Sequence, residues 1–181
     1  MMKKYIIPNI VLLTLVYAGE ISVSISEELV NDYLKLIGDH QIPKGKRDDQ
    51  ALWSIKNPQV KFLEGSAEFH ATVQYKKGKI HIKKQVTKNM YVEYNYDANI
   101  IQLKIENPTI KMERKSKSLG MFDLSSIYQK EGLRFQGPRP KSETIKLKTI
   151  KGRIKIDMNI KKSLIYFEPG VVRVAIDLEY K

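Results

Sequence analysis

The sequence contains no cysteine and only three histidines, and these absences exclude several kinds of chemistry. Without thiols the chain has no disulfide, no thiolate metal ligand and no cysteine nucleophile. It also lacks a phosphate-binding glycine loop, the Gly-x-Ser-x-Gly turn of hydrolases, a His-Glu-x-x-His pair and a calcium-loop pattern. We therefore expect no catalytic residues, no metal site and no cofactor, and we expect that the protein is not an enzyme.

The histidines at positions 40, 70 and 81 do not form a pattern that indicates catalysis or metal binding. His70 and His81 alternate out of phase with their apolar neighbours, so both are expected on an outer strand face. A hydrolase built on Ser125 and Asp123 would need a histidine brought to them by the fold. No sequence feature indicates one, although a histidine-dependent hydrolase remains a third, weaker hypothesis.

The chain also lacks an apolar run of the roughly 20 residues that a bilayer-spanning helix needs. Its longest apolar segment, residues 6–16, follows Met-Met-Lys-Lys and precedes the small residues of a cleavage site. We predict a cleavable signal peptide over residues 1–18, a single domain over residues 19–181, and a periplasmic or secreted protein. A retained anchor helix is the alternative, which Pro8 and the short run disfavour. No cysteine is available for acylation as a lipoprotein.

Basic residues exceed acidic ones by 32 to 20, which gives a formal net charge of +12. An exported protein of this charge is not expected to meet nucleic acid. An anionic membrane surface is a candidate partner. The alternative is that the lysines only solvate the outer faces of strands and prevent edge-to-edge pairing.

One segment has a strong helical period, from Ser24 to Ile37. Its apolar residues recur at steps of three and four, which predicts an amphipathic helix with one apolar stripe. Ser24 and Glu27 have the spacing of a capping box, and Gly38 marks the end.

The remainder of the chain alternates apolar and polar residues between short turns, which predicts about eight antiparallel strands. Asp123 begins a predicted short second helix that Gly132 ends. The Asn57-Pro58 pair recurs as Asn107-Pro108 within matching apolar patterns, and we expect each to kink a strand. The predicted fold class is α+β: a highly curved antiparallel sheet wrapped around one long N-terminal helix, with a short second helix.

The inward positions of this arrangement form a candidate ligand-binding wall, inferred from the helical and strand periods. Its members are Leu29, Tyr33, Leu34, Ile37, Trp53, Phe62, Phe69, Val73, Val92, Tyr94, Leu103, Ile105, Met158 and Phe167. These side chains either fill a packed core or line a tunnel for an acyl chain. Composition alone favours the packed core.

The order of these parts resembles a known family. The segments are Ile25-Ser-Glu-Glu-Leu29, Trp53-x-Ile-x-Asn-Pro-x-Val60, Asp123-Leu124 and Phe167-Glu-Pro-Gly-Val-Val172. Together they resemble the bacterial YceB-like proteins of the tubular lipid-binding (TULIP) superfamily, which includes the bactericidal/permeability-increasing protein. The resemblance spans residues 21–181 and implies a curved sheet around a helix, with lipid held between them, and no catalytic residues.

Two functions follow as expectations. The first is an exported protein that binds or transfers lipid or another long apolar ligand, with acyl chains between helix and sheet. The second is an envelope scaffold or adaptor with a packed core, which binds protein partners through its basic surface or a strand edge.

Overall fold

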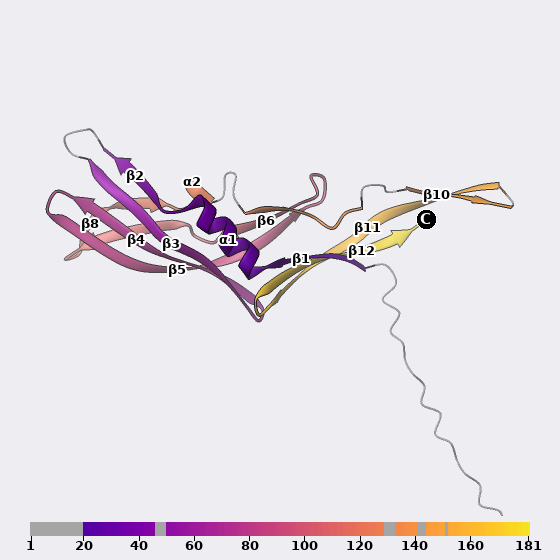
Figure 1. Cartoon of the computed structure of the whole chain (residues 1–181), viewed down its shortest axis with the longest axis horizontal. Coiled ribbons are helices and arrows are strands. Elements are labelled where there is room, and N and C mark those ends of the chain that lie inside the picture. Colours follow the sequence, from indigo (N-terminus) through magenta and orange to yellow (C-terminus); the bar gives the residue numbers. More distant parts are fainter. Residues whose placement is uncertain (1–19, 46–49, 129–132, 141–143, 151) are drawn as a thin grey trace, which may run out of the picture.

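The structure is a computed structural model, and it describes residues 20–45, 50–128, 133–140, 144–150 and 152–181. These residues form a mostly-β protein in which two antiparallel sheets curl strongly, each as a half-barrel. The two half-barrels diverge from a shared apex, so the molecule resembles an open V (Figure 1). The predicted signal peptide lies outside the described residues.

The first half-barrel contains six strands. In spatial order they are β2 (His40–Lys44), β3 (Ala51–Leu63), β4 (Ser66–Lys77), β5 (Ile80–Asn95), β6 (Ile100–Ile105) and β9 (Arg134–Gln136). Along β3, β4 and the later half of β5, buried and exposed residues largely alternate, because one strand face covers the core. The predicted hairpin of β3 and β4 is confirmed. The segments that alternate from residue 80 and from residue 90 form one 16-residue strand.

The second half-barrel contains four strands. In spatial order they are β1 (Glu20–Ser26), β12 (Val171–Tyr180), β11 (Gly152–Glu168) and β10 (Thr144–Thr149). The first and last described strands are therefore neighbours, with Val23 opposite Val174. The predicted strand before the helix and the predicted C-terminal hairpin are both confirmed.

A small third sheet packs over the open face of the first half-barrel. It consists of β7 (Thr109–Arg114) and β8 (Lys117–Asp123), and it leads into α2 (Ser125–Tyr128). The Phe122 ring of β8 stacks on Trp53 of β3, with ring centroids 5.6 Å apart. Ser125 N donates to the Asp123 carboxylate at 2.9 Å, so Asp123 starts this helix as predicted. The helix is described only to Tyr128, because residues 129–132 lie outside the described part.

Two parts of the predicted fold are wrong. The strands form two half-barrels and not one sheet, and the helix α1 (Glu27–Ile37) is 11 residues long and not a long central helix. Alternation predicts that a segment is a strand, but it does not specify which strands pair. Residues 137–140 follow β9 of the first sheet and precede β10 of the second, and their Gly-Pro-Arg-Pro sequence indicates a loop but not a change of sheet.

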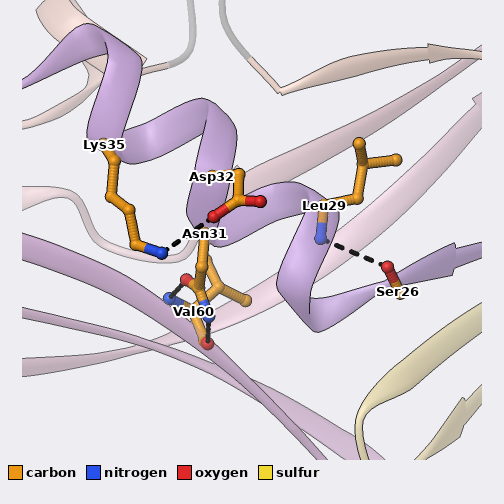
Figure 2. Close-up of polar contacts among 6 residues, drawn as sticks. All are labelled: Ser26, Leu29, Asn31, Asp32, Lys35 and Val60. Atoms are coloured by element: carbon orange, nitrogen blue, oxygen red, sulfur yellow. Dashed lines mark hydrogen bonds and ion pairs between the residues drawn. The ribbon is translucent and has the colours of Figure 1, made fainter.

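The start of α1 also differs from the prediction. Ser24 belongs to β1, and the N-cap is Ser26, whose Oγ accepts from Leu29 N at 3.2 Å (Figure 2). The predicted end is confirmed, because Gly38 adopts a φ of 71° and donates its N–H to Leu34 O at 3.0 Å. The helical period predicts a cap at Ser24, but pairing of β1 with β12 keeps the chain extended as far as Ser26.

Two polar side chains of α1 complete the edge of β3. Strand β2 pairs with β3 only from Ala51 to Ile55, so the later backbone groups on that edge need other partners. Asn31 supplies them for Val60: its Nδ2 donates to Val60 O at 3.0 Å and its Oδ1 accepts from Val60 N at 2.7 Å (Figure 2). Glu27 Oε2 accepts from Phe62 N at 2.8 Å. The helix thus takes the place of a neighbouring strand.

The first Asn-Pro pair kinks a strand, as predicted, whereas the second lies between two strands, and both have an unexpected conformation. Asn57 and Asn107 have φ angles of 50° and 46°, whereas a residue before proline is expected to be extended. At the first copy the register with β4 shifts between Lys56 and Gln59, which is a bulge within β3. The second copy separates β6 from β7, where the chain leaves the six-stranded sheet.

The two half-barrels meet where the β3–β4 turn contacts the β11–β12 turn, and this contact is the apex in Figure 1. Gly65 N donates to Phe167 O and Gly170 N donates to Phe62 O, both at 3.1 Å. Glu27 N donates to Gly170 O at 2.8 Å, so the start of α1 joins the same contact. The Phe62 and Phe167 rings pack against each other across it.

Candidate ligand-binding groove

The first half-barrel holds most of the predicted wall residues, and it is filled by them. Leu34, Phe69, Val73 and Leu103 are 0% exposed, and the other predicted residues in this interior are also buried: Trp53, Phe62, Val92 and Ile105. Side chains this inaccessible leave no space for a water molecule beside them. An acyl chain could enter here only if this core opened.

The predicted helix stripe is divided between two environments. Val30 and Leu34 are fully buried against the sheet, and Ile37 is partly buried at the margin of the core. Leu29 and Tyr33, both predicted to face inward, are 52% and 38% exposed. The helix packs against β3 with one side of its apolar stripe. The other side of the stripe remains exposed.

A groove of about 450 Å³ lies between the two half-barrels. The lining residues come from the β5–β6 turn, the loop after β9, and strands β11 and β12. They are Tyr96, Asp97, Arg139, Pro140, Met158, Asn159, Ile160, Lys161 and Leu178. Met158 is the predicted wall residue that the structure places here. Tyr94 lies behind the groove, and Phe167 is near the apex.

The β11 side of the groove contains a bulge. Ile160 pairs with Leu178 and Lys162 pairs with Asp177, so Lys161 is an extra residue without a position in the β12 ladder. A bulge bends the strand locally and redirects its side chains. Lys161 lines the groove at this bulge, beside Met158 and Ile160 of the same strand.

The opposite side is fixed by Asn99, which has a left-handed φ of 50°. Its Oδ1 accepts from Tyr94 Oη at 2.9 Å and from Arg139 N at 3.0 Å, and its Nδ2 donates to Arg139 O at 3.2 Å. Burial raises the pKa of Tyr94, an effect that the nearby Arg139 opposes, so this hydroxyl stays protonated and can donate at neutral pH. These bonds hold the loop that carries Arg139 and Pro140.

A side-chain hydrogen bond connects the two half-barrels beside the groove. Tyr96 Oη and Ser163 Oγ are 2.6 Å apart, and Arg139 Nη1 donates to the Tyr96 carbonyl at 3.0 Å. The groove therefore combines apolar side chains from β11 and β12 with two cationic groups and the Asp97 carboxylate. This arrangement can hold an apolar chain that ends in a polar or anionic group.

Most groove residues were missed from the sequence. Tyr96, Arg139 and Leu178 belong to distant segments, and their proximity depends on the separation of the strands into two sheets. A usable signal was the segment Asn159-Ile160-Lys161-Lys162, where the apolar alternation of β11 is broken. A break in the period-2 pattern inside a long strand is typical of a bulge.

The histidines do not form a site within the described residues. No group of three or more potential metal ligands occurs there. His70 Nε2 lies 3.0 Å from Glu68 Oε2 and its Nδ1 lies 3.1 Å from Thr87 Oγ1, on the outer face of the sheet. His81 is exposed, and the side chain of His40 is outside what the structure describes.

The described part of the chain has no helix with the length and apolar character that crossing a bilayer requires. Comparison with family models, with curated proteins and with solved structures found no match for this chain.

Proposed function

We propose that the protein binds an amphiphile, a single acyl chain with an anionic head, in the groove between the half-barrels. The observation that carries this proposal is the groove itself, because it joins an apolar floor to cationic groups at the junction of two sheets. Its volume of about 450 Å³ falls within the roughly 300–1,000 Å³ of typical ligand sites, which often lie between structural units. The proposal retains the lipid-binding hypothesis and changes its location.

The two sides of the groove serve different parts of such a ligand. Met158, Ile160 and Leu178 offer hydrocarbon surface, and burying an acyl chain against it contributes about 25 cal/mol per Å² of apolar area. Lys161 is exposed, with no ion-pair partner among the described residues, so it is available to a carboxylate or phosphate. A ligand lying along the groove would have its head near Lys161 and Arg139.

Displacement of a fluorescent fatty acid tests this proposal. Ile160→Trp should fill the floor and prevent binding, whereas Leu164→Trp, on the same strand at an exposed position away from the groove, should leave binding unchanged. Circular dichroism of both variants checks that they are folded. Equal binding by the two variants would contradict the groove as the site.

A second pair of variants tests the role of Lys161 in binding the anionic head of the ligand. Lys161→Gln should weaken binding of the fatty acid by about fivefold, since an exposed ion pair is worth up to about 1 kcal/mol. Lys162→Gln removes the same charge from the adjacent residue, which does not line the groove, and should have no effect. A fatty alcohol should bind both variants equally, because it carries no charge.

A second candidate, the scaffold or adaptor, is favoured by a different observation. Strand β1 is at the end of its sheet, so among the described strands one edge of its backbone has no neighbour. Ile21 on this strand is 37% exposed. An extended peptide added to this edge would make main-chain hydrogen bonds. Ser22→Pro would remove a donor from β1, and loss of a captured peptide with retained fatty-acid binding would support the adaptor function.

A further inference from the structure

The hairpin of β10 and β11 extends beyond the rest of the second half-barrel (Figure 1). The register of β11 with β12 begins at Met158, and Asp157 exchanges two backbone hydrogen bonds with Lys181, so β11 before Asp157 pairs only with β10, from Ile145 opposite Ile156 to Thr149 opposite Gly152. This segment is a two-stranded ribbon, and no sheet or helix of the described residues covers either of its faces. Isolated two-stranded hairpins are marginally stable in water, so contact with another surface would stabilise this ribbon.

One face of the ribbon is apolar. Ile145 is opposite Ile156 and Leu147 is opposite Ile154, so four branched aliphatic side chains share a face. Ile145, Leu147 and Ile154 are 38%, 45% and 49% exposed, and Ile150 in the connecting turn is fully exposed. Exposed aliphatic residues that are contiguous, and not scattered, mark an interaction surface.

The other face is basic. Lys146 is opposite Lys155 and Lys148 is opposite Arg153, and like charges placed directly opposite each other destabilise a strand pair. Residues 144–157 contain four lysines and one arginine against one aspartate, a net charge of +4. Asp157 forms an ion pair with Lys155 at 2.9 Å. The ribbon therefore carries an uncompensated positive charge beside its apolar face.

We propose that this ribbon docks the protein on an anionic lipid bilayer. The aliphatic face and Ile150 enter the boundary between headgroups and acyl chains, and the basic side chains reach the lipid phosphates, as amphipathic elements with cationic polar faces do at membrane surfaces. Each Lys or Arg near an anionic leaflet adds attraction, and burial of the aliphatic side chains adds the apolar contribution.

Charge selects this partner over a second copy of the chain. Two ribbons packed through their aliphatic faces would each carry a net charge of +4, within molecules of net charge +12, whereas an anionic bilayer has the complementary sign. The inference goes beyond the proposed groove function and does not rest on it, because none of the aliphatic residues of the ribbon lines the groove. A protein with an empty groove would still dock.

The absence of cysteine allows one position of the full chain to be labelled. An environment-sensitive fluorophore on Ile150→Cys reports insertion of the ribbon tip, and the same fluorophore on Lys79→Cys, in the β4–β5 turn of the other half-barrel, is the control. Both proteins are mixed with phosphatidylcholine vesicles that contain or lack phosphatidylglycerol. We expect a blue shift, and quenching by spin-labelled lipid, only for Ile150→Cys and only with phosphatidylglycerol.

Variants in the same labelled chain separate the two faces. Lys146→Gln with Lys148→Gln should weaken vesicle binding at least about tenfold, because two charges near an anionic surface are lost. Lys83→Gln with Lys84→Gln removes the same charge from exposed positions on β5 and should change binding less than twofold. Leu147→Ser with Ile154→Ser should abolish the blue shift, and circular dichroism checks that the fold is retained.

Several results would overturn the proposal. They are an unshifted Ile150 probe on anionic vesicles, an equal shift at position 79, and equal weakening by the β5 lysine variants. A fourth contradicting result would come from sedimentation without lipid. Self-association that Leu147→Ser abolishes would assign the aliphatic face to a second copy of the chain. Because fatty-acid displacement is measured without vesicles, failure of docking and failure of the groove function are distinguishable.

Discussion

The two half-barrels are built from similar alternating strands but bury them to different extents. In the first, large side chains from several strands, among them Phe62, Phe69 and Leu103, are fully buried, and α1 and the β7–β8 sheet cover them. In the second, Val172 and Val174 are buried near the apex, whereas Leu164 and Ile154 are well exposed. The first half-barrel therefore has the more completely buried core, and the second leaves more apolar surface exposed.

This difference has a simple origin in the number of elements that cover each sheet. A curled sheet buries its concave face only where something packs into it. The first sheet has a helix and a two-stranded sheet for this purpose, whereas in the part of the chain that the structure describes the outer portion of the second sheet has neither. Exposed apolar residues on the second half-barrel are thus a consequence of its architecture.

The sharpest test of this difference is truncation of a core aromatic residue. Phe69→Ala should lower the free energy of unfolding by about 3–5 kcal/mol, because a fully buried ring is replaced by a cavity. Leu164→Ala in the second half-barrel should cost less than about 1 kcal/mol. Urea denaturation measures both. Similar costs at the two positions would remove the distinction between the half-barrels.

The next effect concerns the covered edge of β3. Asn31→Ala should cost about 2–3 kcal/mol, since both backbone groups of Val60 lose their partner in a part-buried place. Asp32→Ala is the matched control on the same helix turn. Its ion pair with Lys35 is exposed and is expected to contribute less than about 0.5 kcal/mol. Thermal denaturation compares the two, and an Asn31 variant as stable as the control would show that α1 does not complete the sheet.

A smaller effect is expected at the junction of the half-barrels. A Cβ on Gly137 would lie 2.4 Å from both Asn99 Oδ1 and Tyr94 Cε2, so Gly137→Ala must displace the residues that hold the Arg139 loop. We expect a loss of about 1–2 kcal/mol in stability, and weaker fatty-acid binding if the groove is the site. Gly65→Ala has free space for its Cβ, but its φ of 72° disfavours alanine, so it should lower stability without affecting binding, because Gly65 does not line the groove. Retention of full affinity in Gly137→Ala would contradict the groove.

The smallest effect is a pH dependence confined to the second half-barrel. Hydrogen bonds from Lys155 and Thr144 hold the pKa of the Asp157 carboxyl below its ordinary value. A lowered pKa contributes stability above the unfolded-state pKa near about 4, and this is lost as the pH falls through the folded value. Amide chemical shifts of the β10–β11 ribbon should therefore change below about pH 4 in the native chain. The same titration of Asp157→Asn should show no such change. If the variant and the native chain gave identical profiles, Asp157 would not be the titrating group.

The local structure was predictable from the sequence where a short-range pattern determines it. The helical period located α1, Gly38 marked its end, and the alternation in β3 and β4 gave their hairpin. Each of these depends on residues a few positions apart, for which burial on one face is sufficient information.

The sheet division and the groove required information that the sequence does not display. Asn31 appears as a polar residue on a helix surface, and only the structure shows that it pairs with Val60, 29 positions later. The cap at Ser26 instead of Ser24 depends on how far β1 pairs with β12. The groove needs the β5–β6 turn beside β11, a contact between distant segments that periodicity cannot specify.

The contact between the two hairpin turns also has a mechanical consequence. Backbone hydrogen bonds and the Phe62–Phe167 contact fix the half-barrels together at the apex, whereas beside the groove the described residues contribute the single side-chain hydrogen bond between Tyr96 and Ser163. The half-barrels thus have more contacts at the apex than beside the groove. A change in the angle between the half-barrels would therefore break the Tyr96–Ser163 hydrogen bond before it disturbed the backbone contacts at the apex.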